Sequence, residues 1–284
     1  MAGPPRYSAT SSHADYSIWE RATVDSAEQD LFADTLRKVM SANSGPALDK
    51  ALAELGWSEM LADIPDVAIP LVFRLLGESG SHSSILNDVL LLDHRGEPGS
   101  VVPLAFVGRR WVEWSRDSMD GQDSIDPELP LREVDRGIDL PIAQARLALG
   151  WWLVGSSRAM LDLARTHALD RTQFGRPIAS FQAVRHRLAE TLVAIEGAEA
   201  TLRVARDDFG ALLAKAAAGR AATVTSRHAQ QVLGGIGFTA EHPFHRHARR
   251  VIMLDSMLGS SRELTREAGA HIRASQNAPR LIDL

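Results

Sequence analysis

Apolar residues recur at helical spacing through most of the first hundred positions of the chain. Residues 1–14 show no such period and predict a loose tail, whereas residues 15–96 predict a small helical N-terminal region. The first helix of this region starts at a cap formed by Asp25 or Ser26 and ends before Gly45 and Pro46. The apolar spacing then predicts three more helices, at about 47–55, 71–77 and 84–93.

The pattern changes between residues 97 and 138. Short runs rich in β-branched and aromatic residues, at 101–102, 104–107 and 111–114, are typical of strands separated by polar turns. The Asp-rich stretch at 117–128 predicts an exposed loop. Because the region is short, we expect a reduced β region consisting of a small sheet or a few hairpins.

Long helices are predicted for residues 139–284. The apolar period places them at about 142–167, 179–209 and 210–232, followed by a tight turn at 234–237 and a final pair from Pro243 onward. Gly150 and Gly155 lie in the first of these helices and permit close contact with a neighbour. The adjacent Trp151 and Trp152 predict packing or interface residues rather than ligand-stacking ones. The predicted fold is therefore mainly α, with a C-terminal helical bundle.

Composition and charge narrow the class of protein. With 284 residues, 45% of them apolar and 24% charged, the chain has the composition of a globular protein with a sizeable core. The absence of cysteine excludes disulfides, thiolate metal sites and a cysteine nucleophile. A net charge of −5 argues against a general nucleic-acid binder. No apolar run is long enough for a bilayer span and the first residues lack the apolar core of a signal peptide, so we expect a cytoplasmic location.

One loop carries candidate binding chemistry. Residues 170–190 read as a polar turn that contains Arg171 and Arg176 and leads through Pro177 into a long helix. Cations beside the free N–H groups of a helix start are what a bound phosphate requires. The turn lacks a Gly-rich phosphate loop, so its spacing fits an anion site and an ordinary helix connection equally well.

Two motifs in the C-terminal half resemble the acyl-CoA dehydrogenase family of flavoproteins. The first is similar to the family segment R-x-Q-F-G-x-P-I-x-x-F-Q and consists of Arg171, Thr172, Gln173, Phe174, Gly175, Arg176, Pro177, Ile178, Phe181 and Gln182. The second is similar to the turn Q-x-x-G-G-x-G-F and consists of Gln231, Gly234, Gly235, Gly237 and Phe238 with the residues between them. The resemblance is strong over about 139–272 and weaker in the N-terminal helices. It implies that the bundle is the four-helix C-terminal domain of this family.

The resemblance also implies a cofactor, because family members use both motifs across a subunit interface to hold the adenosine and pyrophosphate half of FAD. Arg171 is then expected to pair with the pyrophosphate, Thr172 and Gln173 to hydrogen-bond nearby, and Phe174 to pack on the cofactor. Gln231 and the backbone at Gly234 and Gly235 are expected to close around the adenine end. An arginine fork suits a diphosphate, and glycines let the backbone approach a ligand closely.

The family's catalytic carboxylate has no counterpart at either expected position. The family removes the α-proton of an acyl-CoA with a Glu while the flavin accepts the β-hydride. Counted from Phe238, the usual Glu position is Leu258, and the alternative position, on the helix before the first motif, is Ala145. Asp255 and Glu263 lie near Leu258 in sequence, and either a substitute base or a surface or cap carboxylate fits them. The family's flavin-supporting β domain is also not recognisable in the short middle region.

The resemblance therefore implies a non-catalytic subunit of a heteromeric acyl-CoA dehydrogenase. The expected partner is a full-length acyl-CoA dehydrogenase chain in an α2β2 heterotetramer, like the actinobacterial enzymes that shorten steroid side chains as CoA thioesters. Three alternatives stay open: a self-sufficient dehydrogenase with Asp255 as base, a flavin-free scaffold or CoA-ester-binding protein, and a lyase or hydratase built on the same helices.

Overall fold

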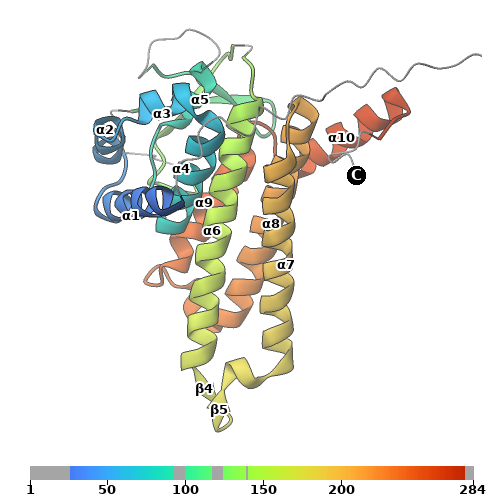
Figure 1. Ribbon diagram of the computed structural model, residues 1–284. Coiled ribbons are helices and arrows are strands. Elements are labelled where there is room, and N and C mark those ends of the chain that lie inside the picture. Colours follow the sequence, from blue (N-terminus) through green and yellow to red (C-terminus); the bar gives the residue numbers. More distant parts are fainter. Residues whose placement is uncertain (1–25, 93–99, 117–123, 139, 279–284) are drawn as a thin grey trace, which may run out of the picture.

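The computed structural model describes residues 26–92, 100–116, 124–138 and 140–278. Their structure is mainly α, as the sequence predicts, with long antiparallel helices below a head made of shorter helices and a small sheet (Figure 1). The tail at 1–14, the expected cap at Asp25 and residues 117–123 of the predicted acidic loop lie outside the described residues. Among the described residues, no helix has both the length and the apolar character needed to span a bilayer.

Four long helices form the bundle: α6 (Ala143–Asp170), α7 (Gln182–Val204), α8 (Asp208–Leu233) and α9 (Phe244–Ser256). A further helix, α10 (Ser261–Ser275), packs against α8. The predicted single helix at 179–209 is wrong at both ends. Residues Ile178–Ser180 form a short 3₁₀ turn before α7, and the chain breaks after Val204 because Asp207 caps α8, its Oδ1 accepting from the Gly210 N–H at 2.6 Å.

The N-terminal helices are α1 (Ser26–Ala42), α2 (Pro46–Glu54), α3 (Trp57–Asp63), α4 (Pro65–Ser79) and α5 (Leu86–Leu91). The sequence interpretation missed α3 and started α4 six residues late. Proline at position 65 falls in the first turn, where its missing N–H is not needed, so α4 begins there and continues through Pro70. The α4 and α6 backbones touch at Gly77 and Gly155, where any Cβ would overlap the facing main chain.

Three short strands form the antiparallel sheet β1-β2-β3: β1 (Pro103–Phe106), β2 (Arg110–Trp114) and β3 (Leu131–Val134). Residues 101–102 are not a strand, and β3 was not predicted. The acidic segment at 124–128 is not simply an exposed loop either, because Asp126 is fully buried. It pairs with the buried guanidinium of Arg250 on α9, which also donates to the Ser81 carbonyl at 2.9 Å. This ion pair joins α9, the loop after α4 and the segment before β3.

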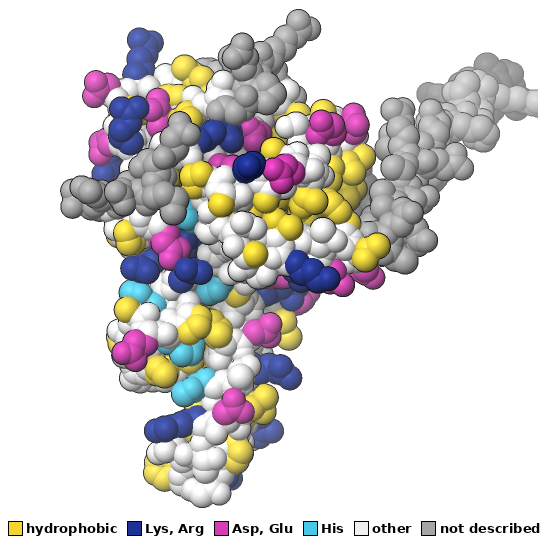
Figure 2. Space-filling view, turned by 90° about the vertical axis from the view of Figure 1, so that its left-hand side faces the viewer, with side chains coloured by type: hydrophobic (Ala, Val, Ile, Leu, Met, Phe, Trp, Pro, Cys, Tyr) yellow, Lys and Arg dark blue, Asp and Glu magenta, His cyan; other side chains and the backbone are white. Residues whose placement is uncertain are grey.

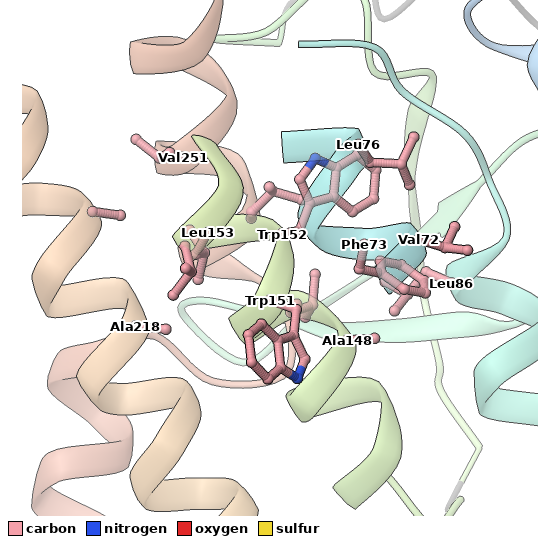
Figure 3. Close-up of a cluster of buried hydrophobic side chains, with 14 of the residues drawn as sticks. Val72, Phe73, Leu76, Leu86, Ala148, Trp151, Trp152, Leu153, Ala218 and Val251 are labelled. Atoms are coloured by element: carbon pink, nitrogen blue, oxygen red, sulfur yellow. The ribbon is translucent and has the colours of Figure 1, made fainter. Parts of the chain in front are cut away.

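Aromatic side chains connect the head to the bundle in one continuous core. Trp57 of α3 contacts Phe73 of α4, Phe73 contacts Trp152 of α6, and Trp152 stacks on Trp114 of β2 with ring centroids 5.6 Å apart. Figure 3 shows Trp151 and Trp152 leaving α6 on different sides. Both are almost fully buried, at 6% and 0% exposure, so the packing role predicted for this pair is confirmed.

Candidate functional site

The first motif forms a tight hairpin between α6 and α7. Strands β4 (Thr172–Gln173) and β5 (Arg176–Pro177) pair antiparallel. The two residues between them, Phe174 and Gly175, both have positive φ, 54° and 78°, as a two-residue type I′ turn requires. Arg171 ends α6: its N–H donates to His167, and its carbonyl accepts from Ile178 at 2.8 Å. The dipeptide Phe174-Gly175 therefore forms a defined tight turn at the tip of a projecting hairpin.

The side chains of this hairpin face outward. Residues 171–177 are all exposed, and Phe174 is 91% exposed, an unusual state for an aromatic ring. The Arg176 guanidinium stacks 4.4 Å from the centroid of the Phe181 ring, which fixes one of the two motif arginines. The Arg171 guanidinium, in contrast, makes no hydrogen bond or ion pair with any residue that the structure describes. It is available for an anion.

The second motif ends α8. Gln231 is exposed in the last turn, and Gly234 caps the helix with φ 62° and ψ −136°, a conformation suited to glycine. The chain then turns through the 3₁₀ helix η3 (Gly234–Phe238). A Cβ on Gly234 or Gly235 would meet no atom within 4 Å, so open space lies in front of this backbone. The two glycines thus offer main chain that a ligand from outside could approach.

Both motifs lie toward the same end of the bundle, away from the head (Figure 1). Histidine and arginine side chains lie near the first motif. The pKa of His167, in the last turn of α6, is lowered by burial and further by the positive charges of His242 and Arg171. Figure 2 shows histidines and arginines on one face of the bundle, with Asp or Glu side chains between them. The exposed Arg171 therefore places a positive charge at this end of the bundle, where the anion site is predicted.

The α9–α10 connection contains Leu258, the counted position of the family's base. Leu258 is 2% exposed and has a positive φ of 53°, rare for a leucine. Its N–H donates to the Ala105 carbonyl at 2.8 Å, and its own carbonyl accepts from Arg146 Nε at 3.1 Å. Ala145, the other candidate position, is fully buried. Neither side chain can accept a proton.

Asp255 and Glu263, the two nearby carboxylates, are occupied by the backbone. Asp255 accepts from the N–H of Ser261 at 3.0 Å and from its hydroxyl at 3.1 Å. Glu263 forms a capping box with Ser260 at the start of α10, and these hydrogen bonds lower the pKa of its carboxyl group. Of the two interpretations offered for these carboxylates, the geometry favours caps.

Lys215 was missed by the sequence interpretation although it holds this connection in place. It lies on α8, is fully buried, and donates to the carbonyls of Asp255, at 2.7 Å, and Gly259. Burial lowers the pKa of Lys215 to about 8. The sequence signal that could have identified Lys215 is that it is the only lysine in an alanine-rich stretch of α8. The residues around it all predict the buried face of that helix.

Known proteins resemble this chain in sequence and in fold. The family profile "Acyl-CoA dehydrogenase, C-terminal domain" matches residues 138–272. Acyl-CoA dehydrogenase IpdE2 of Mycobacterium tuberculosis is 30% identical over 239 residues, which cover 80% of this chain and 72% of that protein. The chain belongs to the acyl-CoA dehydrogenase family. The bovine mitochondrial short-chain specific acyl-CoA dehydrogenase is 31% identical over 170 residues, but these span 57% of this chain and only 39% of that enzyme.

Solved acyl-CoA dehydrogenase structures share the fold at low identity. The Tcur3481-Tcur3483 steroid ACAD G363A variant superposes with a TM-score of 0.65 over 89% of this chain and 99% of that one, at 16% identity. The ChsE4-ChsE5 complex from Mycobacterium tuberculosis gives a TM-score of 0.61 over 91% and 99%, at 20% identity. The predicted acyl-CoA dehydrogenase type of helical C-terminal domain is thereby confirmed.

Proposed function

We propose that this chain is the non-catalytic subunit of a heteromeric, FAD-dependent acyl-CoA dehydrogenase. The observation that carries the proposal is a contrast within the chain. The Arg171 guanidinium proposed to pair with a diphosphate is exposed and has no hydrogen-bond or ion-pair partner among the described residues, whereas the two positions for a catalytic base hold Leu258 and Ala145, both buried and apolar.

The proposed role of the hairpin is to bind the adenosine and pyrophosphate half of FAD carried by a partner chain. The Arg171 guanidinium would pair with the diphosphate, with Thr172 and Gln173 donating nearby and the exposed Phe174 ring packing on the cofactor. When bound, FAD supplies a hydride acceptor for desaturation of the acyl group. A hairpin that projects from its own subunit, as this one does, is suited to complete a binding site on a neighbouring subunit.

The second motif would contribute at the adenine end. Gln231 is exposed there, and the open space in front of Gly234 and Gly235 lets a planar group approach the main chain. No side chain of this chain serves as the base in the proposal. Asp255 is held by Ser261 and lies 3.9 Å from Lys215 Nζ, so the proton acceptor must come from the partner.

The partner we propose is a full-length acyl-CoA dehydrogenase chain, in a cytoplasmic α2β2 heterotetramer. The structural neighbours support this choice, because one is a two-protein complex, ChsE4-ChsE5, and another is a steroid acyl-CoA dehydrogenase formed by Tcur3481 and Tcur3483. The substrate class we propose is correspondingly a steroid side-chain CoA thioester, bound mainly by the partner. We infer both the partner and the substrate class from these relatives.

Co-expression with a full-length acyl-CoA dehydrogenase subunit tests the proposal. The chain alone should be colourless, and the co-purified complex should show flavin absorbance and the mass of a heterotetramer. Arg171→Ala should weaken FAD binding about 10- to 150-fold, because a hydrogen bond to a charged group contributes about 1.5–3 kcal/mol. Arg185→Ala is the matched control, since Arg185 is an exposed arginine at the start of α7.

Three results would refute the proposal. A chain that is yellow when purified alone and desaturates an acyl-CoA with an electron acceptor is self-sufficient, and Asp255→Asn would then show whether Asp255 is its base. A complex whose flavin content is the same with Arg171→Ala as with Arg185→Ala does not use the hairpin as proposed. A complex that stays colourless assigns the chain to a flavin-free scaffold or CoA-ester-binding role.

A further inference from the structure

Arg176 is the second arginine of the hairpin, and the function proposed above gives it no role. Its side chain is exposed, and its guanidinium makes no hydrogen bond or ion pair with any residue that the structure describes. The guanidinium is nevertheless held in place, because its carbon lies over the Phe181 ring, 4.4 Å from the ring centroid. Arg176 is therefore an oriented cation without an anionic partner.

The contact with Phe181 leaves hydrogen-bond donors of Arg176 free. A guanidinium carries five N–H donors in a rigid planar fork, whereas attraction to an aromatic face depends on its positive charge. Only donors on one side of the group can face the ring. The others point away from Phe181 and are available to a ligand.

Phe181 is a firm support for this cation. It is the N-cap residue of α7, and its carbonyl accepts from the N–H groups of Val184 and Arg185 at 3.1 and 3.2 Å. Its ring is half-buried and also meets the edge of the Phe174 ring, with centroids 6.1 Å apart. The Phe181 side chain thus connects the start of α7 to both strands of the hairpin.

The register of the hairpin puts Arg176 on the same face as Arg171. Gln173 pairs with Arg176, and the Arg171 carbonyl accepts from the Ile178 N–H, which continues the antiparallel register by one pair. Side chains alternate between the two faces along each strand, so Arg171, Gln173 and Arg176 share one face. Arg171 and Arg176 are diagonal neighbours, which lie roughly 7–8 Å apart in such a ladder. Long arginine side chains can close that distance around one ligand.

No carboxylate in the hairpin competes for these two cations. The sequence contains no Asp or Glu from Arg171 to Ala189. Asp170 directly precedes this stretch, and its charge acts on His167, one turn back on α6. A pair of guanidinium groups without a carboxylate suits a ligand with two linked anionic groups, because each group can take one fork.

We propose that Arg176 is a second diphosphate-binding residue and that Phe181 positions it. One phosphate group would pair with Arg171 and the other with Arg176, with Gln173 between them on the same face. The inference rests on the function proposed above, since the diphosphate is that of the FAD assigned to Arg171. It adds a binding residue and a positioning residue to that site.

Two adenosine nucleotides test the proposal on the full chain. ADP-ribose carries the diphosphate diester that FAD also contains, whereas AMP carries a single phosphate of similar total charge. Binding is followed by nitrogen NMR through the Nε–Hε signals of the arginine side chains, each assigned by its loss in the corresponding variant. We expect ADP-ribose to shift the signals of Arg171 and Arg176, to leave that of Arg185 unmoved, and to bind more tightly than AMP.

Substitution of Arg176 should remove the preference for the diphosphate. Arg176→Gln should weaken ADP-ribose about tenfold through the loss of one charge-assisted contact, and should leave AMP almost unchanged because Arg171 remains. Arg185→Gln, at an exposed arginine in the first turn of α7, is the matched control and should change neither affinity. Circular dichroism and thermal melting establish that each variant is folded.

A double-mutant cycle tests the role of Phe181. Phe181→Leu keeps an apolar side chain but removes the ring, so it should weaken ADP-ribose about two- to fivefold. It should cause no further loss in the Arg176→Gln background, because the cation that it positions is then absent. Equal losses in both backgrounds overturn the positioning role.

The remaining outcomes separate this inference from the proposed function. If Arg171→Ala weakens ADP-ribose and Arg176→Gln does not, Arg176 is outside the site and the proposed function stands. If Arg176→Gln weakens AMP and ADP-ribose equally, the effect is one of general charge and the diphosphate contact is overturned. If ADP-ribose shifts neither signal and Arg171→Ala changes nothing, both the inference and the cofactor role of the hairpin fail.

Discussion

Raising the pH from 7 to about 10.5 should stabilise this protein, because Lys215 buries a positive charge. Its ammonium group is completely shielded from solvent, and its pKa falls from 10.5 to about 8. Between these values the unfolded lysine holds a proton that the folded one has released. The unfolded state therefore binds more protons, and the free energy of unfolding increases with pH across this window.

The structure sets the size of this effect. The difference between an ordinary lysine pKa and about 8 corresponds to roughly 3 kcal/mol at full deprotonation. Deprotonation does not cost the contacts of Lys215, because a neutral amine keeps two N–H donors for the two carbonyls of Asp255 and Gly259. Few other groups titrate in this range, since the chain has three lysines, two tyrosines and no cysteine.

Urea titrations followed by circular dichroism at several pH values between 7 and 10.5, at constant ionic strength, measure this increase. Lys215→Met should remove it whatever its effect on stability at pH 7, and Lys38→Met, at an exposed site, should retain it. Parallel pH profiles for the wild type and Lys215→Met would refute the reasoning, because the alkaline stabilisation would then come from other groups.

Three further predictions concern stability and are measured by urea titration. Asp126→Ala removes the buried carboxylate partner of Arg250 and leaves it paired with Glu128, so it should cost about 1.5–3 kcal/mol; a cost below 1 would contradict this. Gly175→Ala, at φ 78°, should destabilise by about 1–2 kcal/mol, whereas Gly197→Ala, in open space on α7, should stabilise by about 0.5–1. Burial lowers the pKa of His247 to about 4. The free energy of unfolding should therefore decrease as the pH is lowered from 6.5 to 4, and this decrease should be smaller in His247→Gln.

The sequence predicts the long helices well because they carry their own apolar period. The helix at 142–167 was predicted within three residues at each end, since Pro141 precedes α6 and the polar hairpin at 171–177 follows it. The acidic segment before β3 was not predictable in this way. Asp126 can be buried because it pairs with Arg250. Arg250 lies more than a hundred residues away in sequence, and the spacing of residues contains no information about that pair.

The candidate site was found through its motifs, and its surroundings were not. The motifs name Arg171 and Gly234, and the structure adds that the guanidinium is uncommitted and that the glycines face open space. The role of Lys215 depends on the carbonyls of Asp255 and Gly259, which come into reach only through tertiary packing. Backbone acceptors leave no trace in a sequence pattern.

The outer edge of β1 is completed by a segment from the far end of the chain. Phe106 bridges to Met257, and the Val107 N–H donates to the Ser256 carbonyl at 2.8 Å. About 150 residues separate the two segments, so a ribosome needs roughly ten to thirty seconds to deliver the second after the first. During that interval the nascent chain exposes the unpaired edge of β1. When several chains are synthesised close together, we expect this edge to be the place where strands of neighbouring chains pair wrongly.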